Sequence, residues 1–505
     1  MPLTRNAALA ALAAACALMP TAVLSQEPVR YEADWASLDQ RPTPQWWRDA
    51  KFGIFIHWGV YSVPAYAPKG EYAEWYWDRS GRAVTDDTPE WERPIIEEVH
   101  AFHDRVYGAQ TDYADFAADF DASFFDAAQW AEMFAGAGAQ YVVLVSKHHD
   151  GFALWPSAEA SDNWGRPWNS AEIGPMRDIV GELTDAVRAE GLRMGIYFSL
   201  YEWFHPLYDP ADPGAYVTQH MAPQLRDVVT RYEPEVIFAD GEWEAPSADW
   251  RSEDLLAWLF NDSPVAGTVV VNDRWGEETR HKHGGYYTTE YGAGMPDSTH
   301  PWEENRGMGH SYGFNRNEEL ADYATDRELL LTLIDTVSRG GNLLLNVGPT
   351  ADGRIPVIMQ DRLAYIGTWL EHNGEAIFGT VTYGSGVQWT DGSQPQIDTD
   401  TIYRADYDVV ELLVSPQPGQ ARKEVLYTRK GDTLYAIAPI YPVGALELSG
   451  VTVSDDVRVT LLGHDGTQLT ATAYGDDLVI ETPPVAPGEL PFEGAFVFRI
   501  EGLAD

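Results

Sequence analysis

The sequence is poor in cysteine and in long apolar runs. Its single cysteine, Cys16, lies within the apolar stretch Ala7–Pro20, which is too short to cross a bilayer. Arg5 precedes this stretch and small residues follow it near Ser25, a pattern typical of an export signal. We therefore expect residues 1–25 to be a signal peptide, and no later run predicts a membrane span.

Removal of that segment would leave a mature chain without cysteine. Disulfides, a zinc thiolate site and a cysteine nucleophile are then excluded. Ala13 stands three positions before Cys16, where a lipoprotein signal needs leucine or a similar residue, so the pattern argues against a lipid anchor. Export without disulfides favours the bacterial periplasm or the extracellular medium.

Positive charge is also scarce. The chain has 34 Lys and Arg against 78 Asp and Glu, a formal net charge of −44. Such a balance argues against nucleic-acid binding, because phosphates are held by lysine and arginine. It would keep a protein soluble in brine, so a saline habitat is one hypothesis. A homo-oligomer is compatible with the sequence.

Short apolar runs alternate with amphipathic stretches between about residues 50 and 375. We expect strands at Phe52–His57, Tyr141–Lys147, Arg193–Ser199, Glu235–Asp240, Thr268–Asn272, Tyr286–Glu290 and Asn342–Val347. Helices are expected at Asp126–Ala137, Asp178–Glu190, Arg327–Val337 and Asp361–Leu370, with Gly138, Gly191 and Gly340 as left-handed caps. The fold class is therefore α/β, with a (β/α)8-like, TIM-type barrel over residues 26–378.

The pattern of apolar and polar residues changes after residue 378. Short alternating segments separated by turns predict strands at Glu424–Thr428, Thr433–Ala438, Val457–Leu462, Leu478–Glu481 and Ala495–Ile500. Residues 379–505 are therefore predicted to form an antiparallel β-sandwich that supports the barrel. The stretches Asp78–Arg93 and Gly292–Asn305 are expected to be loops.

Polar residues recur where the predicted barrel strands end, the place where barrels carry their chemistry. They are His57, Lys147, His148, His149, Asp150, Tyr197, Asp240, Asp273, Arg274 and Glu290. A single polar residue there is more often a structural cap, but so many at once favour an active site. Asp240 and Glu290 could be the two carboxylates of glycoside hydrolysis, although Asp240 could instead cap the next segment.

Seven motifs, in order from about residue 30 to 380, give the chain a specific resemblance. They are Lys51-Phe-Gly-Ile-Phe-Ile-His-Trp-Gly, Tyr72-Ala-Glu-Trp-Tyr, Lys147-His-His-Asp-Gly-Phe, Ser199-Leu-Tyr-Glu-Trp-Phe-His-Pro, Asp240-Gly-Glu-Trp, Val271-Asn-Asp-Arg-Trp-Gly and Gly340-Gly-Asn-Leu-Leu-Leu-Asn-Val-Gly-Pro. Together they resemble the family 29 α-L-fucosidases, and residues 234–287 are especially similar to the lysosomal animal members.

The resemblance implies an exo-acting, retaining hydrolase of fucosylated oligosaccharides or glycoconjugates with no cofactor and no metal. By motif, Asp240 takes the place of the nucleophile. The positions that hold the fucose hydroxyls are matched by His57, Glu74, His148, His149, Tyr197 and Arg274. The apolar side of the pocket is matched by Trp75, Phe238 and Tyr312, with Phe238 where tryptophan is frequent.

The proton donor is less sharply indicated, because the family varies at this point. Glu290 is the first candidate, from its strand-end position and its spacing after Arg274-Trp-Gly. Glu303, in Trp302-Glu-Glu-Asn, is the second candidate.

Two other classes of protein remain open. A metal-dependent barrel hydrolase would need ligands, and His281-Lys-His283 has the required His-x-His spacing, although it falls in a polar loop. A catalytically inactive sugar-binding protein would be expected to lack a catalytic carboxylate, whereas Asp240 and Glu290 are both present. The predicted sandwich has only Trp389 as a tryptophan, which argues against a sugar-binding role for it.

Overall fold

A computed structural model describes residues 29–295, 299–397, 401, 404–405, 407–486 and 488–504. The predicted signal peptide, residues 1–25, lies outside these residues. The elements below belong to one unit that begins at Tyr31. Within the described residues, we find no helix that combines the length and the apolarity needed to cross a membrane.

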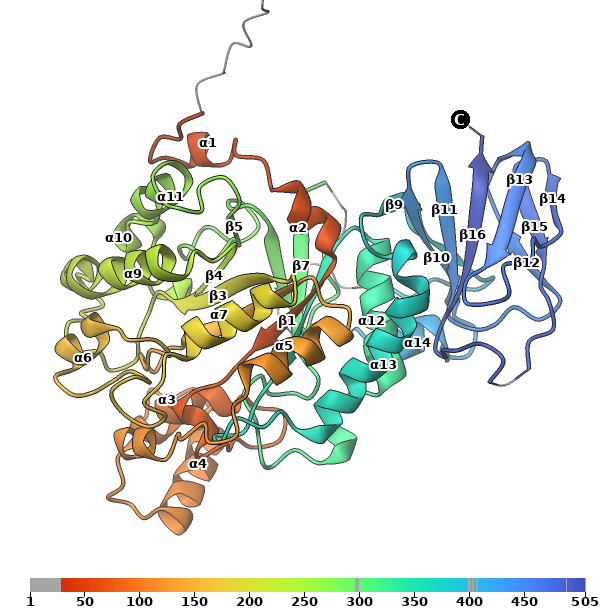
Figure 1. Cartoon of the computed structure of the whole chain (residues 1–505). Coiled ribbons are helices and arrows are strands. Elements are labelled where there is room, and N and C mark those ends of the chain that lie inside the picture. Colours follow the sequence, from red (N-terminus) through yellow and green to blue (C-terminus); the bar gives the residue numbers. More distant parts are fainter. Residues whose placement is uncertain are drawn as a thin grey trace, which may run out of the picture. The chain divides into compact units, whose positions relative to one another are not determined.

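Eight parallel strands form the central sheet, seen at the centre of Figure 1. They are β1 (Phe52–Ile56), β2 (Tyr141–Lys147), β3 (Arg193–Ser199), β4 (Val236–Asp240), β5 (Val270–Val271), β6 (Tyr287–Glu290), β7 (Trp302–Gly307) and β8 (Asn342–Val347). Their order is β5-β4-β3-β2-β1-β8-β7-β6. The predicted barrel-like α/β fold is confirmed as a curled sheet whose end strands are β5 and β6.

One strand is absent from the sequence prediction. We expected residues 292–305 to be a loop, but β7 begins inside it and pairs with both β6 and β8. Its sequence, Trp-Glu-Glu-Asn-Arg-Gly, has no apolar run, yet five of its six residues are buried. The strand is stabilised by polar contacts within the sheet, and a search for apolar runs misses it for that reason.

The remaining elements of this part of the chain are helices and single helical turns. The helices are α1 (Trp35–Leu38), α2 (Gln45–Ala50), α3 (Tyr76–Gly81), α4 (Arg93–Val106), α5 (Ala127–Gly136), α6 (Ala158–Trp164), α7 (Ile179–Ala189), α8 (Gly214–Tyr216), α9 (Ala222–Tyr232), α10 (Ser247–Trp250), α11 (Ser252–Asn261), α12 (Asp326–Ser338) and α13 (Val357–Asn373). The turns are η1 (Val60–Ser62), η2 (Ala73–Trp75), η3 (Tyr113–Ala118), η4 (Val217–Met221), η5 (Glu242–Glu244), η6 (Leu320–Asp322) and η7 (Gly374–Ala376).

Three of the four predicted helices, α5, α7 and α12, begin and end within one residue of their predicted bounds, whereas α13 extends beyond the predicted Asp361–Leu370 at both ends. Asp126 accepts hydrogen bonds from the first turn of α5, and Thr325 forms a reciprocal capping box with Glu328 at the start of α12. These side chains satisfy backbone N–H groups that have no partner within the helix. Gly138 and Gly340, which follow α5 and α12, have φ of 84° and 91°, a left-handed conformation that favours glycine.

The two faces of the sheet bury two separate apolar clusters. Phe55, Val143 and Phe238 belong to the cluster that fills the inside of the curled sheet. Ile54, Val142 and Ile237, their neighbours along the same strands, belong to the larger cluster beneath the helices. This alternation follows from the two-residue period of a strand, and it makes the interior a packed core rather than a channel.

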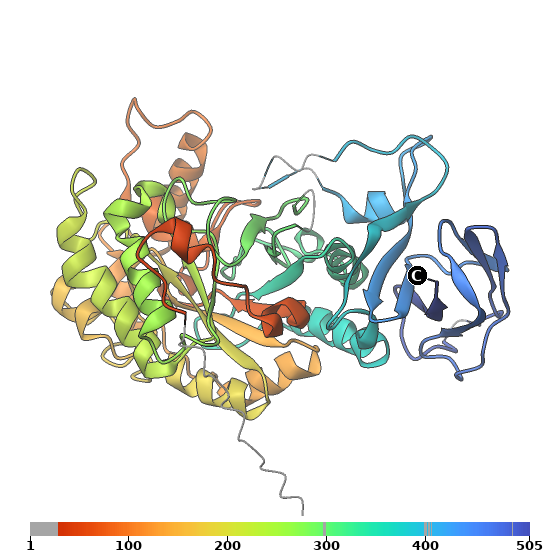
Figure 2. The same cartoon turned by 90° about the horizontal axis from the view of Figure 1, so that it is seen from above.

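The last part of the chain is antiparallel, as predicted. One sheet has the order β13-β16-β11-β10-β9 and the other β12-β15-β14. Their bounds are β9 (Val381–Trp389), β10 (Lys423–Lys430), β11 (Thr433–Ala438), β12 (Ala445–Leu448), β13 (Val453–Leu461), β14 (Ala471–Tyr474), β15 (Asp477–Glu481) and β16 (Phe496–Leu503), and α14 is Val409–Leu413. Figure 2 shows these strands gathered at one end of the chain.

Hydrogen bonds and a buried ion pair join the sheets to the helices before them. Lys423 on β10 contacts Asp335 on α12, and Trp389 of β9 lies near the same ammonium group. Trp369 on α13 donates its indole N–H to the carbonyl of Ala495 at 2.9 Å. Removing one partner of a buried ion pair is strongly destabilising, because the other charge is left buried and unpaired. These contacts therefore hold the sandwich against α12 and α13.

Candidate active site

Parallel strands present their carboxyl ends at one edge of the sheet, which we call the mouth. The opposite edge, where the strands begin, we call the floor. Asp240 is the last residue of β4 and Glu290 the last residue of β6, so both carboxylates lie at the mouth. Each side chain is mostly buried, with about 11% of its surface exposed.

One guanidinium group joins the two carboxylates. Arg274 donates from Nη1 to Asp240 Oδ1 at 2.7 Å and from Nη2 to Glu290 Oε2 at 3.1 Å. Its Nε donates to Thr288 Oγ1 at 3.1 Å, which fixes the plane of the group. Two carboxylates on the same cation are held close to each other in a site that has little contact with water.

Asp240 is strongly biased toward its ionised form. Burial alone would raise the pKa of this carboxyl, but the charge of Arg274 and a hydrogen bond from His149 outweigh it. The pKa of Asp240 is therefore held well below its usual range. Tyr197 also donates its hydroxyl to Asp240 Oδ2 at 2.7 Å, so both oxygens are bound. The outcome is a fixed, charged carboxylate.

His57 is held as a neutral acceptor at the mouth. Asn346 donates its amide to the carbonyl of Tyr312 at 2.7 Å, so its Oδ1 accepts from His57 Nδ1 at 2.7 Å. The proton of His57 is thus on Nδ1, and Nε2 is left as an acceptor. Burial, the main cause, lowers the pKa of His57 to about 3.

The ring of His149 is oriented by a hydrogen bond at its Nδ1. Ser199 gives its hydroxyl proton to the carbonyl of Tyr201, so its oxygen accepts from His149 Nδ1 at 2.5 Å. His149 Nε2 then faces Asp240 Oδ2 at 3.5 Å and the Tyr197 hydroxyl at 3.4 Å. Beside it, His148 is buried, and burial holds its pKa well below the usual value.

Glu74 lies on η2 beside these rings. Its Oε2 accepts from the backbone N–H of Gly313 at 2.8 Å and from Ser311 Oγ at 3.2 Å. Burial raises the pKa of Glu74 to about 7, against the opposing effect of those hydrogen bonds. Trp75, the next residue, is half-buried, and its ring centroid is 5.7 Å from that of His149.

Aromatic rings form the other wall. Phe238 lies under the Arg274 guanidinium, with 5.0 Å from the Arg274 Cζ to the ring centroid. Tyr312 packs against His57 at a centroid distance of 4.7 Å. The structure brings all eleven predicted site residues into one connected group: His57, Glu74, Trp75, His148, His149, Tyr197, Phe238, Asp240, Arg274, Glu290 and Tyr312.

Other predicted polar residues have structural partners. Asp150 accepts from the hydroxyl of Tyr113 at 2.8 Å, and Asp273 accepts from Thr288 Oγ1 at 2.7 Å. The second proton-donor candidate, Glu303, accepts a hydrogen bond from Tyr141, the first residue of β2. Glu303 is therefore on the floor side of the interior, and its side chain is fully buried.

Several contacts at the mouth are not evident in the sequence. Tyr72 donates its hydroxyl to Glu290 Oε1 at 2.8 Å, although its motif drew attention only to Glu74 and Trp75. Glu242, two residues after Asp240, is buried, and burial followed by the charge of Asp240 raises its pKa to about 7. No spacing rule would have identified Tyr72, because its partner Glu290 ends a strand that is distant in the sequence.

Arg404 also reaches the mouth, from the part of the chain predicted to be the sandwich. Its backbone N–H donates to the Glu290 carbonyl at 2.8 Å, and its guanidinium lies over the Tyr72 ring at 4.4 Å. The expectation that this part of the chain only supports the barrel is therefore incomplete.

The two histidines of the His281-Lys-His283 motif contact different parts of the molecule. His281 Nε2 lies 2.9 Å from the carbonyl of Thr288, whereas His283 Nδ1 lies 2.8 Å from Asp39 Oδ2. The two side chains thus do not share a ligand position. Within the described residues, a different group of metal-ligand types is formed by Glu202, His205 and His220.

An ammonium group also contacts this group. Lys147 Nζ lies 2.5 Å from Glu202 Oε1, which also accepts from His220 Nε2 at 2.7 Å. Trp164 donates to the other oxygen of Glu202 at 3.0 Å. Positive charge and hydrogen bonds already satisfy the carboxylate, so we interpret the group as a buried ion-pair network rather than a metal centre.

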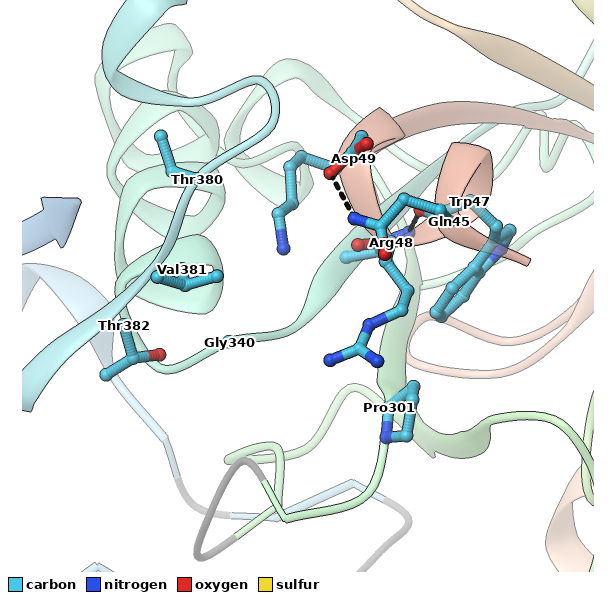
Figure 3. Close-up of a pocket in the computed structure, with 11 residues that line it drawn as sticks. Gln45, Trp47, Arg48, Asp49, Pro301, Gly340, Thr380, Val381 and Thr382 are labelled. Atoms are coloured by element: carbon cyan, nitrogen blue, oxygen red, sulfur yellow. Dashed lines mark hydrogen bonds between the residues drawn. The ribbon is translucent and has the colours of Figure 1, made fainter. Parts of the chain in front are cut away.

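A pocket of about 260 Å³ lies at the floor, away from these residues. Its lining includes Lys51 and Asn342, which stand where β1 and β8 begin. Figure 3 shows Gln45 and Asp49 joined by a hydrogen bond on one side and Thr380 on the other. None of the eleven predicted site residues lines it, so the candidate site is the mouth.

The mouth combines two carboxylates on one guanidinium, buried histidines and aromatic walls at the carboxyl edge of a parallel curled sheet. These features define the class of barrel glycoside hydrolases. Comparison with known proteins identifies the particular family. An α-L-fucosidase family model matches residues 18–375, and a model of the α-L-fucosidase C-terminal domain matches residues 417–501. The chain belongs to the α-L-fucosidase family.

Individual relatives agree with this assignment. The chain is 40% identical to the tissue α-L-fucosidase of Homo sapiens over 489 residues, which covers 95% of this chain and 93% of the relative. It is 46% identical to an α-L-fucosidase of Dictyostelium discoideum over 70% of this chain and 75% of that one. The solved Thermotoga maritima α-fucosidase in complex with fucose superposes with a TM-score of 0.70 at 32% identity, covering 93% of this chain and all of the other.

Proposed function

We propose that the protein is a retaining, exo-acting α-L-fucosidase that releases terminal α-L-fucose from oligosaccharides or glycoconjugates. Membership of the family supports the substrate class. The observation that carries the mechanism is the pair of carboxylates on Arg274, one at the end of β4 and one at the end of β6. Such a pair can act on opposite sides of one anomeric carbon.

In the first step, Asp240 attacks the anomeric carbon and forms a fucosyl ester while the glycosidic C–O bond breaks. Glu290 gives its proton to the departing oxygen. In the second step, Glu290 takes a proton from water, the water oxygen bonds to the anomeric carbon, and Asp240 leaves as a carboxylate. Asp240 is suited to the ionised role by its lowered pKa, which leaves Glu290 to exchange the proton.

The other mouth residues would bind the sugar. Fucose has hydroxyls on three ring carbons besides the anomeric one and a methyl group in place of a hydroxymethyl group. His57 offers a neutral Nε2 acceptor, His149 presents its Nε2, Tyr197 and Arg274 offer donors, and Glu74 accepts. Phe238, Trp75 and Tyr312 supply apolar surface for the methyl group. We propose no cofactor and no metal for this chemistry.

The remaining predictions about the chain are part of this proposal. We propose a signal peptide at residues 1–25, a catalytic domain at 26–378 and a β-sandwich domain at 379–505. The mature protein would then act in the periplasm or outside the cell. Activity that survives EDTA, together with no stoichiometric metal by elemental analysis, is the expected result for a metal-free enzyme; loss of activity with loss of bound zinc would contradict it.

Proton NMR of the first-formed sugar tests the proposal. A double displacement inverts the anomeric carbon twice, so α-L-fucose should appear before mutarotation. Initial β-L-fucose would contradict the retaining mechanism even if fucosides proved to be the substrates. A failure to hydrolyse any α-L-fucoside, including activated aryl fucosides, would contradict the substrate class and favour a sugar-binding protein.

A further inference from the structure

Trp243 is a partly exposed indole next to the proposed nucleophile. It lies in η5, the turn that follows β4, three residues after Asp240. The left-handed Gly241, with φ of 78°, directs the chain into this turn. Whereas the proposed fucose-binding histidines are at most 4% exposed, Trp243 is 40% exposed.

The indole is not a loose surface side chain. Its ring stacks on that of Trp75, with a centroid distance of 6.2 Å and an angle of 19° between the planes. Trp75 in turn packs edge-on against the buried Trp203 at 5.1 Å. Trp243 also meets the ring of His149 at 5.3 Å. Packing against Trp75 and His149 therefore holds one side of the indole, and the exposed part is a pre-positioned surface.

Polar groups surround that surface. The indole N–H of Trp243 donates to Glu244 Oε1 at 3.1 Å. Glu244 is exposed, so its carboxyl group can be reached from solvent. The carboxylate has further acceptor capacity, so a hydroxyl group near the ring could bind there. An aromatic face beside a hydroxyl acceptor is a surface that suits a sugar ring.

The pocket also limits where the rest of a substrate can lie. The groups proposed to hold fucose are buried, and an exo-acting site takes one ring into such a pocket. The sugar attached through the scissile oxygen must then lie on residues at the rim. Trp243 is at the rim because it shares contacts with the pocket residues Trp75 and His149 yet meets solvent.

We propose that Trp243 is the platform of an aglycone subsite, on which the leaving-group sugar stacks through its C–H face while Glu244 accepts from one of its hydroxyls. This inference rests on the proposed fucosidase activity and assigns the binding of the leaving group to a named surface. Trp243 is thus a specificity residue: it binds the leaving group only when that group contains a sugar ring that can stack on the indole.

Leaving groups with and without a ring test the subsite. We would measure kcat/KM of wild type and Trp243→Ala on α-L-fucosyl fluoride, whose leaving group is a single atom, and on fucosyl disaccharides of defined linkage. The ratio of disaccharide to fluoride kcat/KM should fall roughly five- to tenfold, the size expected from losing one aromatic contact. Trp243→Phe should lie between, because a smaller ring is retained.

Two controls separate the possible causes. Tyr474→Ala removes an exposed aromatic side chain from β14, far along the chain from the mouth, and should leave the ratio unchanged. Fucosyl transfer to added galactose should decline relative to hydrolysis in Trp243→Ala, because an acceptor sugar attacks the fucosyl-enzyme from the same subsite.

Each outcome is decisive. An equal loss on the fluoride and the disaccharides would overturn the subsite, since Trp243 would then shape the fucose pocket itself. An unchanged ratio would overturn it as well. A wild-type protein that hydrolyses neither kind of substrate would contradict the proposed function, whereas wild-type activity with an unchanged ratio would contradict only the subsite.

Discussion

The mouth and the floor of the curled sheet both bury carboxyl groups, but the pKa of Asp240 at the mouth and that of Glu303 toward the floor are shifted in opposite directions. At the mouth, Asp240 shares the guanidinium of Arg274 with Glu290, and the pKa of Asp240 is held well below its usual range. Toward the floor, Glu303 accepts from Tyr141, and burial raises its pKa to about 8. Burial is the largest effect on both groups, so the position of one cation decides which carboxyl is ionised at neutral pH.

A third buried carboxylate, that of Glu202, is also ion-paired with a cation, but this ion pair stabilises the fold and takes no part in the proposed reaction. Glu202 lies in a network with Lys147 and His220, and the side chains of both partners are fully buried. Burial would raise its pKa, but the charges of His220 and Lys147 hold the pKa well below the usual value. Asp240 differs from Glu202 because Asp240 lies at the mouth, where a substrate can reach it.

The largest effect is expected at Asp240. Asp240→Gly should lower kcat by at least about a thousandfold, because no other group can form the covalent intermediate. The fold should persist, as shown by an unchanged circular dichroism spectrum, since the residue ends a strand rather than filling the core. Azide should restore part of the rate and give β-L-fucosyl azide. A variant that kept more than a tenth of the wild-type kcat would contradict the assignment.

The next largest effect is expected at Glu290, and it allows a direct comparison between a carboxyl group at the mouth and one at the floor. Glu290→Gln should reduce kcat/KM about 10²–10⁴-fold on fucosides with poor leaving groups, which need a proton, and far less on activated aryl fucosides. Glu303→Gln is the matched control, because a glutamine replaces a carboxyl that is already protonated; kcat should stay within about threefold. If Glu303→Gln shows the leaving-group dependence and Glu290→Gln does not, the proton donor is Glu303.

This contrast was only partly predictable from the sequence. Asp240 ends an apolar strand, so the usual strand pattern placed it at the mouth, and the same pattern placed His57 and Tyr197. Glu303 could not be placed, because β7 has no apolar run and was expected to be a loop. The relative positions of Glu290 and Glu303 depend on β7, which was not predicted. These positions therefore depend on contacts between distant segments, which no local sequence pattern encodes.

Partners from distant segments were the other unpredictable part. Tyr72 meets Glu290 across 218 residues, and Asn346 orients His57 across 289. Hydrogen bonds of this kind arise only after the sheet has formed. The helices and their glycine caps, by contrast, depend on neighbouring residues and were found from the sequence, as at Gly138 and Gly340.

A smaller change is expected in the structural network. Lys147→Met should destabilise the protein by about 3–5 kcal/mol, because it leaves Glu202 charged, buried and short of one partner. The midpoint of thermal unfolding should drop accordingly. Lys147→Met combined with Glu202→Gln should recover part of the loss, because the uncompensated charge is removed. If the double variant unfolds at a lower temperature than Lys147→Met, the hydrogen bonds of Glu202 matter more than its charge.

The smallest effect concerns the pH dependence of stability at the floor. The folded protein keeps the proton of Glu303 up to about pH 8, whereas the unfolded chain releases it near the ordinary value of 4.5. Between these values the folded state binds more protons, so this carboxyl contributes a stability that falls as pH rises. The contribution is fully present below pH 4.5 and is lost as pH rises through the folded-state value.

Glu303→Gln removes this titration and retains the shape of the side chain. Measured by urea unfolding, the stability of wild type minus that of Glu303→Gln should decrease by about 1–3 kcal/mol between pH 5 and pH 8.5. Taking this difference cancels the other buried carboxyls with raised pKa values, such as Glu74 and Glu242, because both proteins contain them. A difference that stays constant over this range would mean that Glu303 is ionised in the folded protein, and the contrast between mouth and floor would be wrong.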